Sequence, residues 1–120
     1  MEEILTIQVR CRPGHVLVAV AGEIDISTVP RLRGVLRTVT ADGVRVIVDL
    51  DQVSFIDATG LGALADAAGR AGAAGGSLHV TAAAPRVRRL LAITGLDRHL
   101  LMPTAEAEAA DDSGPDVTPR

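Results

Sequence analysis

The stretch VRVIVDLDQVSFIDATGLG, residues 44–62, decides the fold of this chain. Its first part, Val44 to Leu50, is the most β-branched segment of the sequence and predicts a strand. Its last part, FIDATGLG at residues 55–62, combines an acid, a hydroxyl and small glycines, which favours a helix start near Thr59 or Gly60. A strand that leads directly into a helix is the repeating unit of an α/β domain.

Two strands are predicted before this stretch. Ile4 to Arg10 alternates between apolar and polar residues, which is typical of a half-exposed strand. Val16 to Ala21 is apolar on both faces and predicts an interior strand that Gly22 ends. Because only a short turn with Pro13-Gly14 separates the two, we expect an antiparallel hairpin.

A helix is expected between the hairpin and the central strand. Ser27 or Thr28 can cap it, Pro30 is tolerated in its first turn, and Asp42-Gly43 ends it. Its predicted apolar face comprises Val29, Leu32, Leu36 and Val39.

Two more helices are expected after FIDATGLG. The first ends at Gly75-Gly76, and a short strand with Leu78 and Val80 follows. The second begins at Pro85, and Gly95 suits the left-handed residue after its last turn. Their predicted apolar faces are Leu61, Leu64, Ala65 and Ala68 in the first, and Val87, Leu90, Leu91 and Thr94 in the second.

The end of the chain predicts one last short strand and a tail. Leu100 and Leu101 are the candidate strand, and residues 103–120 are small, acidic and without periodicity, as in a disordered segment. The expected organisation is therefore one folded domain at 1–102 and an acidic tail at 103–120. The order β-β-α-β-α-β-α predicts an α/β fold: a mixed sheet of about four strands, an N-terminal hairpin and then parallel crossovers.

Composition and charge exclude several functions. The tail has five acidic residues against one arginine, a net charge of −4, which leaves the folded part at +1. A nearly neutral domain without Trp or Tyr is a poor nucleic-acid binder. The longest apolar stretch, Val16 to Ala21, is too short to span a bilayer, and the acidic N-terminus does not resemble a signal peptide. With a single cysteine, Cys11, we expect a cytoplasmic protein without disulfides.

Most candidate chemical groups have a simpler structural explanation. Three scattered histidines lack metal-ligand spacing, and Cys11 has no histidine beside it, so neither a metal site nor a nucleophile is expected. Asp49 and Asp51 are interpreted as a solvated strand end rather than a catalytic pair. Three arginines, Arg86, Arg88 and Arg89, are interpreted as the exposed side of a helix, with a docking surface as the alternative. No cofactor is expected.

Two acids mark a candidate interaction surface. Asp57 and Asp25 each follow a predicted strand and precede a predicted helix, so each can cap a helix. Capping is the simple explanation for the presence of either acid when it is considered alone. If their strands are neighbours, both acids lie at one edge of the sheet, where sites of α/β proteins gather. We call this surface the acidic edge; it comprises Asp25, Ser27, Asp57, Ala58, Thr59, Gly60, Leu61 and Gly62.

Three blocks of the chain together resemble a known family. GEIDISTVPRLRGVL, VIVDLDQVSFIDATGLGAL and PRVRRLLAITGLDRHL, in this order, resemble the STAS domain of bacterial anti-sigma factor antagonists, from about Ile4 to Met102. The resemblance implies a small mixed sheet with helices on one side. It also implies partner switching: the antagonist binds an anti-sigma factor that is a serine kinase, and a sigma factor is released.

The resemblance also implies regulation by phosphorylation. In that family the kinase modifies a serine at the start of the second helix, and a phosphatase reverses it. The family motif reads D-S-[ST]-G, whereas this chain reads Asp57-Ala58-Thr59-Gly60, so Ala58 stands at the acceptor position. Two alternatives follow: a constitutive binder, or Thr59 as a substitute acceptor. The first is favoured because a shift of one residue turns a helical side chain by about 100°.

Two other functions remain open from the sequence. The chain could be a scaffold or sensor subunit that assembles with other STAS proteins or binds a small ligand. An enzyme is not expected, because no catalytic group has a visible partner. As partner we expect an anti-sigma factor with a serine-kinase fold, and a phosphatase is a further candidate partner. We expect no direct contact to nucleic acid or membrane, and the protein itself as a monomer or weak dimer.

Overall fold

A four-stranded mixed sheet forms the centre of the computed structural model, which describes residues 5–82 and 84–102. Its strands lie in the order β1 (Leu5–Arg12), β2 (His15–Ile24), β3 (Arg45–Ile56) and β4 (Ser77–Thr81). β1 and β2 form the predicted antiparallel hairpin, while β2–β3 and β3–β4 are parallel. The predicted α/β fold class is confirmed.

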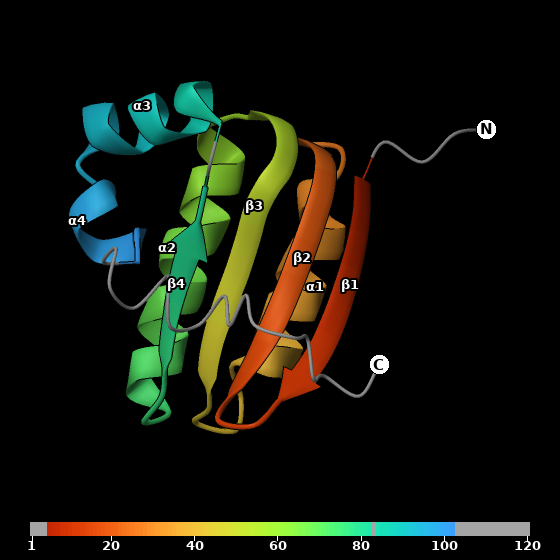
Figure 1. Ribbon diagram of the computed structural model, residues 1–120, viewed down its shortest axis with the longest axis vertical. Helices are drawn as coiled ribbons and strands as arrows, with labels where there is room; N and C mark the ends of the chain where they lie inside the picture. Colours follow the sequence, from red (N-terminus) through yellow and green to blue (C-terminus); the bar gives the residue numbers. More distant parts are fainter. Residues whose placement is uncertain (1–4, 83, 103–120) are drawn as a thin grey trace.

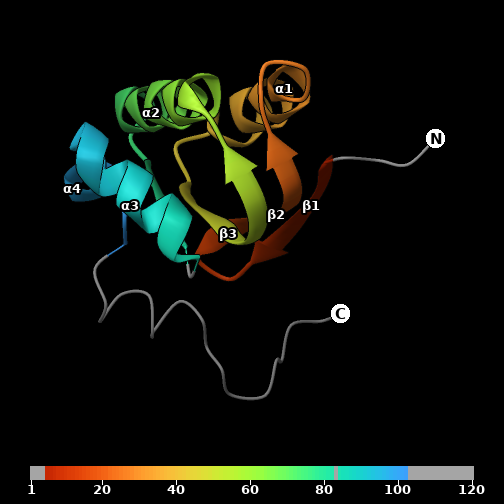
Figure 2. The same cartoon turned by 90° about the horizontal axis from the view of Figure 1, so that it is seen from above.

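The helices form one layer and one flank (Figures 1 and 2). α1 (Val29–Val39) and α2 (Ala58–Ala73) cover the same face of the sheet, as crossovers between parallel strands require. α3 (Pro85–Thr94) and α4 (Asp97–Leu100) lie beside β4. The buried core between the sheet and the two long helices includes Val18, Val20, Leu32, Leu36, Val46, Val48, Leu50 and Leu64.

The strands β2 and β3 both extend beyond the ends that the sequence predicted. β3 does not end at Leu50 but runs to Ile56, and β2 continues past Gly22 to Ile24. Two register shifts in the β2–β3 pairing make this possible, between Ala19 and Ala21 and between Gly22 and Glu23. At each shift β3 has one residue more than β2, as in a β-bulge, and Gly22 has a φ of 110° that few other residues adopt.

The bulges also explain Asp49 and Asp51, whose interpretation as a strand end is wrong. Both residues lie inside β3, and the Asp49 carboxylate accepts the backbone N–H of Asp51 at 2.9 Å, beside the first shift. At the second shift the Ser54 hydroxyl donates to the Gly22 carbonyl at 3.3 Å. Polar side chains here accommodate irregular backbone in a continuous strand.

The predicted last strand is wrong as well. Leu100 ends the short helix α4, in which the Leu100 N–H donates to the Leu96 carbonyl at 2.8 Å. Only Leu101 pairs with the sheet, through a single parallel bridge to Val80. The predicted tail, residues 103–120, lies outside the described residues.

Helix α2 buries a face that matches the predicted one only in part. Leu61 and Leu64 are buried as expected, but Ala65 and Ala68 are only half-buried. The small residues Gly60, Ala63, Ala67 and Ala71 complete the interior side beside Leu61 and Leu64. Because small residues allow the helix to lie close to the sheet, the positions of the larger apolar residues alone do not predict which side of α2 is buried.

Among residues 5–82 and 84–102, none of the helices has both the length and the apolar character that a membrane span requires.

Candidate functional site

Asp25 organises the turn between β2 and α1. Its Oδ1 atom accepts the backbone N–H groups of Ser27 and Thr28 at 2.9 and 3.1 Å and the Ser27 hydroxyl at 2.7 Å. Thr28 occupies the N-cap position, but its side chain caps no helical N–H. The buried Thr28 hydroxyl donates to the Glu23 carbonyl at 2.8 Å instead. The prediction that Ser27 or Thr28 caps the helix is therefore wrong; both side chains brace the turn built around Asp25.

Asp57 caps α2 as predicted. Its Oδ1 atom accepts the N–H groups of Thr59 and Gly60 at 3.0 and 3.2 Å, which supplies two partners that the first helical turn lacks. The Thr59 hydroxyl donates to the same oxygen at 2.5 Å. The helix begins at Ala58, one residue before the predicted range.

The sheet brings the two acids to one edge, as expected from neighbouring strands. Ile24 pairs with Ile56, and the N–H of Asp57 donates to the Ile24 carbonyl at 3.2 Å. The pKa of each carboxyl is below its ordinary value, chiefly because Ser27 donates to Asp25 and Thr59 donates to Asp57. The charge of Asp25 works in the opposite direction on the pKa of Asp57. Both groups are thus anionic at neutral pH and close enough to sense one another.

The other residues of the acidic edge differ in accessibility. Ser27 and Ala58 are exposed, and Thr59 and Gly62 are half-buried. Gly60 and Leu61 face the interior; a Cβ atom on Gly60 would lie 2.6 Å from Ile24 Cγ2. The absence of a side chain at Gly60 therefore serves packing, whereas a Cβ on Gly62 would meet nothing within 4 Å.

Two apolar side chains at this edge were missed from the sequence. Ile26, between Asp25 and Ser27, is 74 % exposed, and Phe55, which pairs with Glu23, is 41 % exposed. Their signals are visible in retrospect: Ile26 interrupts a polar run, and Phe55 is the only aromatic residue of the chain. Exposed large apolar residues beside fixed carboxylates are typical of a protein-binding surface.

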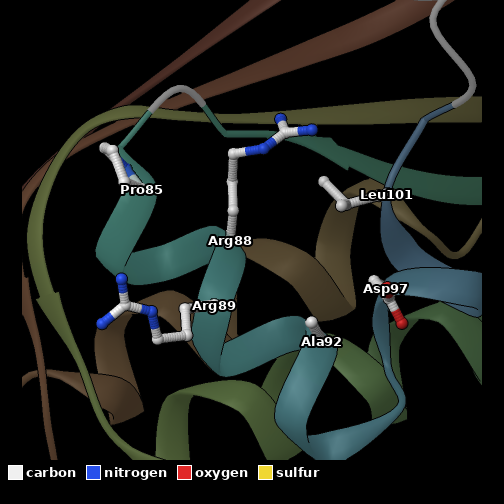
Figure 3. A pocket seen from close by; sticks show the side chains of 6 residues that line it. All are labelled: Pro85, Arg88, Arg89, Ala92, Asp97 and Leu101. Carbon is white, nitrogen blue, oxygen red and sulfur yellow. The ribbon is translucent and has the colours of Figure 1, made fainter.

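The remaining candidates lie elsewhere. The described residues contain no group of three or more side chains able to hold a metal ion. Arg86, Arg88 and Arg89 are exposed on α3 as predicted. Arg88 and Arg89 border an open hollow of about 530 Å³ in Figure 3, together with Asp97 of α4. Arg88 donates to the Ala82 carbonyl at 2.7 Å, so part of this arginine cluster supports the start of α3.

Comparison with known proteins identifies a family and several relatives of this chain. The model of the STAS domain family matches residues 6–109. The chain is 39 % identical over 80 residues to an anti-sigma-B factor antagonist of Staphylococcus aureus, covering 66 % of this chain and 74 % of that protein. It is 34 % identical to the anti-sigma-B factor antagonist of Bacillus subtilis over 92 residues, which cover 77 % of this chain and 84 % of the relative.

A solved structure agrees with these relatives. The crystal structure of an anti-sigma factor antagonist from Mycobacterium paratuberculosis superimposes with a TM-score of 0.77. It shares 34 % sequence identity and covers 88 % of this chain and 92 % of its own.

Proposed function

The chain belongs to the STAS domain family, among the anti-sigma factor antagonists, and we propose that it works by partner switching. It binds an anti-sigma factor with a serine-kinase fold, and the sigma factor held by that protein is released for transcription. The observation that carries the proposal is the acidic edge, where two ionised carboxylates flank exposed apolar and small residues at the ends of β2 and β3.

The physical logic of the edge favours a protein partner. Asp25 and Asp57 are held by several hydrogen bonds each, so little side-chain entropy is lost when a partner's cationic groups approach. Ile26 supplies a protruding apolar side chain of the kind that dominates binding energy in protein interfaces. At neighbouring Gly62, open space lets a partner's surface approach the helix backbone.

Calorimetry with candidate anti-sigma factors from the host tests this function. We expect a 1:1 complex, and we expect Ile26→Asp to weaken it at least tenfold, which corresponds to about 1.4 kcal/mol. Ile93→Asp is the matched control, because Ile93 is 72 % exposed but lies on α3. Equal losses for both variants, or no binding by any anti-sigma factor of the host, would contradict the proposal.

The acidic edge also contains the position at which phosphorylation would regulate binding. We propose that this chain binds its anti-sigma factor constitutively. Ala58 is the first residue of α2, is exposed and has no hydroxyl to modify. Thr59 has a hydroxyl, but that group donates to the carboxylate that caps the helix. A phosphate there would add a charge of about −1.5 to −2 directly beside Asp57. Phosphorylation and a phosphatase partner are therefore not needed for this chain's cycle.

Incubation with the cognate kinase and ATP, followed by mass spectrometry, tests constitutive binding. We expect no added phosphate on the wild-type chain. Phosphate on Thr59 would overturn constitutive binding but leave the antagonist function intact.

We further propose that the protein is cytoplasmic, has no enzyme activity and acts as a monomer or weak dimer. The side chains of Asp25 and Ser27 hold a turn, and those of Asp57 and Thr59 hold a helix start, which favours binding over catalysis. Turnover of a substrate by the isolated protein would contradict this part. Large self-associating species in light scattering would favour the alternative, a scaffold that assembles with other STAS proteins.

A further inference from the structure

The sheet has one face that no described helix covers. α1 and α2 lie on the opposite face (Figure 2), and α3 and α4 lie beside β4 (Figure 1). Leu17 and Ile47 form a short apolar row on the uncovered face, next to His79, because Leu17 pairs with Ile47 and Ile47 pairs with His79. Ile47 is only 2 % exposed although it does not belong to the core beneath the helices. We call this surface the open face.

Cationic side chains gather on the open face near the β1–β2 turn. Arg10 pairs with Leu17, and Arg45 lies two residues before Ile47 on β3, so both share the face of the apolar row. Arg12 follows two residues after Arg10 and pairs with His15. The pKa of His15 is below its ordinary value, because of burial and then because of the positive charges of Arg45 and Arg12. The cations are therefore close enough to act as one patch.

The described chain ends beside this face. The N–H of Met102 donates to the Val80 carbonyl at 3.0 Å, next to His79 on β4. Residues 103–120 continue from there with five acids and one arginine. Extended, this segment spans up to about 60 Å, and four strands are only about 15 Å across. It has ample length to reach β1.

We propose that the acidic segment 103–120 docks on the open face of its own chain and pairs its carboxylates with Arg10, Arg12 and Arg45. Charge complementarity, the apolar row and the exit point of the chain each point to this occupant. Because the segment is tethered, docking is intramolecular and proceeds at an effective concentration in the millimolar range. The arginines lie toward the β1–β2 turn, and the acidic edge lies at the other ends of β2 and β3. Docking therefore leaves the acidic edge accessible, and this inference does not depend on the proposed function.

A spin label in the segment tests the docking directly. Ser113→Cys is labelled in a Cys11→Ser background, since Cys11 is the only cysteine of the chain. We expect the label to broaden the amide NMR signals of Leu17, Ile47 and His79 several-fold more than those of α1, which lies behind the sheet. Broadening of neither region, or of both equally, would overturn the proposal.

Two further measurements identify the cause and the occupant. Arg10→Gln, Arg12→Gln and Arg45→Gln together are expected to abolish the selective broadening. The control combines Arg86→Gln, Arg89→Gln and Arg98→Gln, which remove the same charge from exposed sites on α3 and α4 and are expected to retain it. Broadening that survives in the first variant refutes recognition by these arginines. Equal broadening of an isotope-labelled chain by a separate spin-labelled chain would assign the contact to a second copy and refute self-docking.

Discussion

The two glycines at the start of α2 give a sharp test of how this helix meets the sheet. In Gly60→Ala the new Cβ atom would lie 2.6 Å from Ile24 Cγ2 and 2.7 Å from Ile56 Cγ1, closer than van der Waals contact permits. Both isoleucines are buried, so relief requires movement of the core. Gly62→Ala, two residues later, meets nothing within 4 Å.

The magnitude follows from a comparison of the two variants. Each replaces a helical glycine by alanine, so each gains up to about 1 kcal/mol of helix propensity. Overpacking a well-filled core costs about 1–3 kcal/mol, and only Gly60→Ala incurs it. The difference in free energy of unfolding between the variants is therefore about 1–3 kcal/mol, because the propensity term cancels.

Urea denaturation monitored by circular dichroism measures this difference. Gly62→Ala should be as stable as the wild type or more stable, and Gly60→Ala should have the lower midpoint. In thermal unfolding each kcal/mol corresponds to about 4–8 °C in Tm for a domain of this size. Equal stability of the two variants would refute the close approach of α2 to the ends of β2 and β3.

Three further predictions concern charge and modification. Ala58→Ser restores the hydroxyl at the exposed first residue of α2, so the cognate kinase should phosphorylate this variant. The added phosphate should then weaken binding to the anti-sigma factor at least tenfold. A variant that stays unmodified would contradict the assignment of the acceptor position. The folded-state pKa of Asp57 is lowered, so its contribution to stability is complete above the unfolded pKa near 3.8 and is lost as pH falls through the folded value. Asp57→Asn, which keeps a capping oxygen, should therefore reduce the slope of stability against pH in acid, and an unchanged slope counts against the cap. Because the Arg45 charge lowers the pKa of His15, Arg45→Gln should raise that pKa in an NMR titration, and a constant value would show that the two groups do not interact.

The order of elements and most of their ends were predictable because local chemistry determines them. Pro85 begins α3, and Gly95 takes the left-handed conformation at its end, with a φ of 78°. A glycine with a positive φ likewise lies in the hairpin turn at Pro13-Gly14 and after the end of α2, where Gly75 has a φ of 93°. In each case one residue type restricts or frees the backbone, and that signal needs no knowledge of the tertiary structure.

The errors in strand ends arose where pairing between distant segments, or a competing helical turn, overrides the local pattern. Asp49 and Asp51 look like the polar end of a strand, yet pairing with β2 carries the strand through two bulges to Ile56. Leu100 and Leu101 look like a strand, yet Leu100 lies in the helical turn of α4, which leaves a single bridge from Leu101 to Val80.

The acidic edge shows the same division between local and long-range signals. The sequence alone predicted that Asp57 caps α2. The prediction that Asp25 lies near Asp57 followed from the expected order of the strands. That Gly60 faces the core while Ile26 faces solvent depends on packing between distant segments, which no local pattern reports.

Partner switching itself is tested most directly by competition. A preformed complex of an anti-sigma factor and its sigma factor, both from the host, is mixed with this protein and separated by size-exclusion chromatography. If the chain works by partner switching, free sigma factor and a new complex of this protein with the anti-sigma factor appear. Ile93→Asp should then be as active as the wild type, and Ile26→Asp should be impaired. Partner switching is contradicted if every complex of an anti-sigma factor and its sigma factor from the host stays intact at saturating concentrations of correctly folded protein.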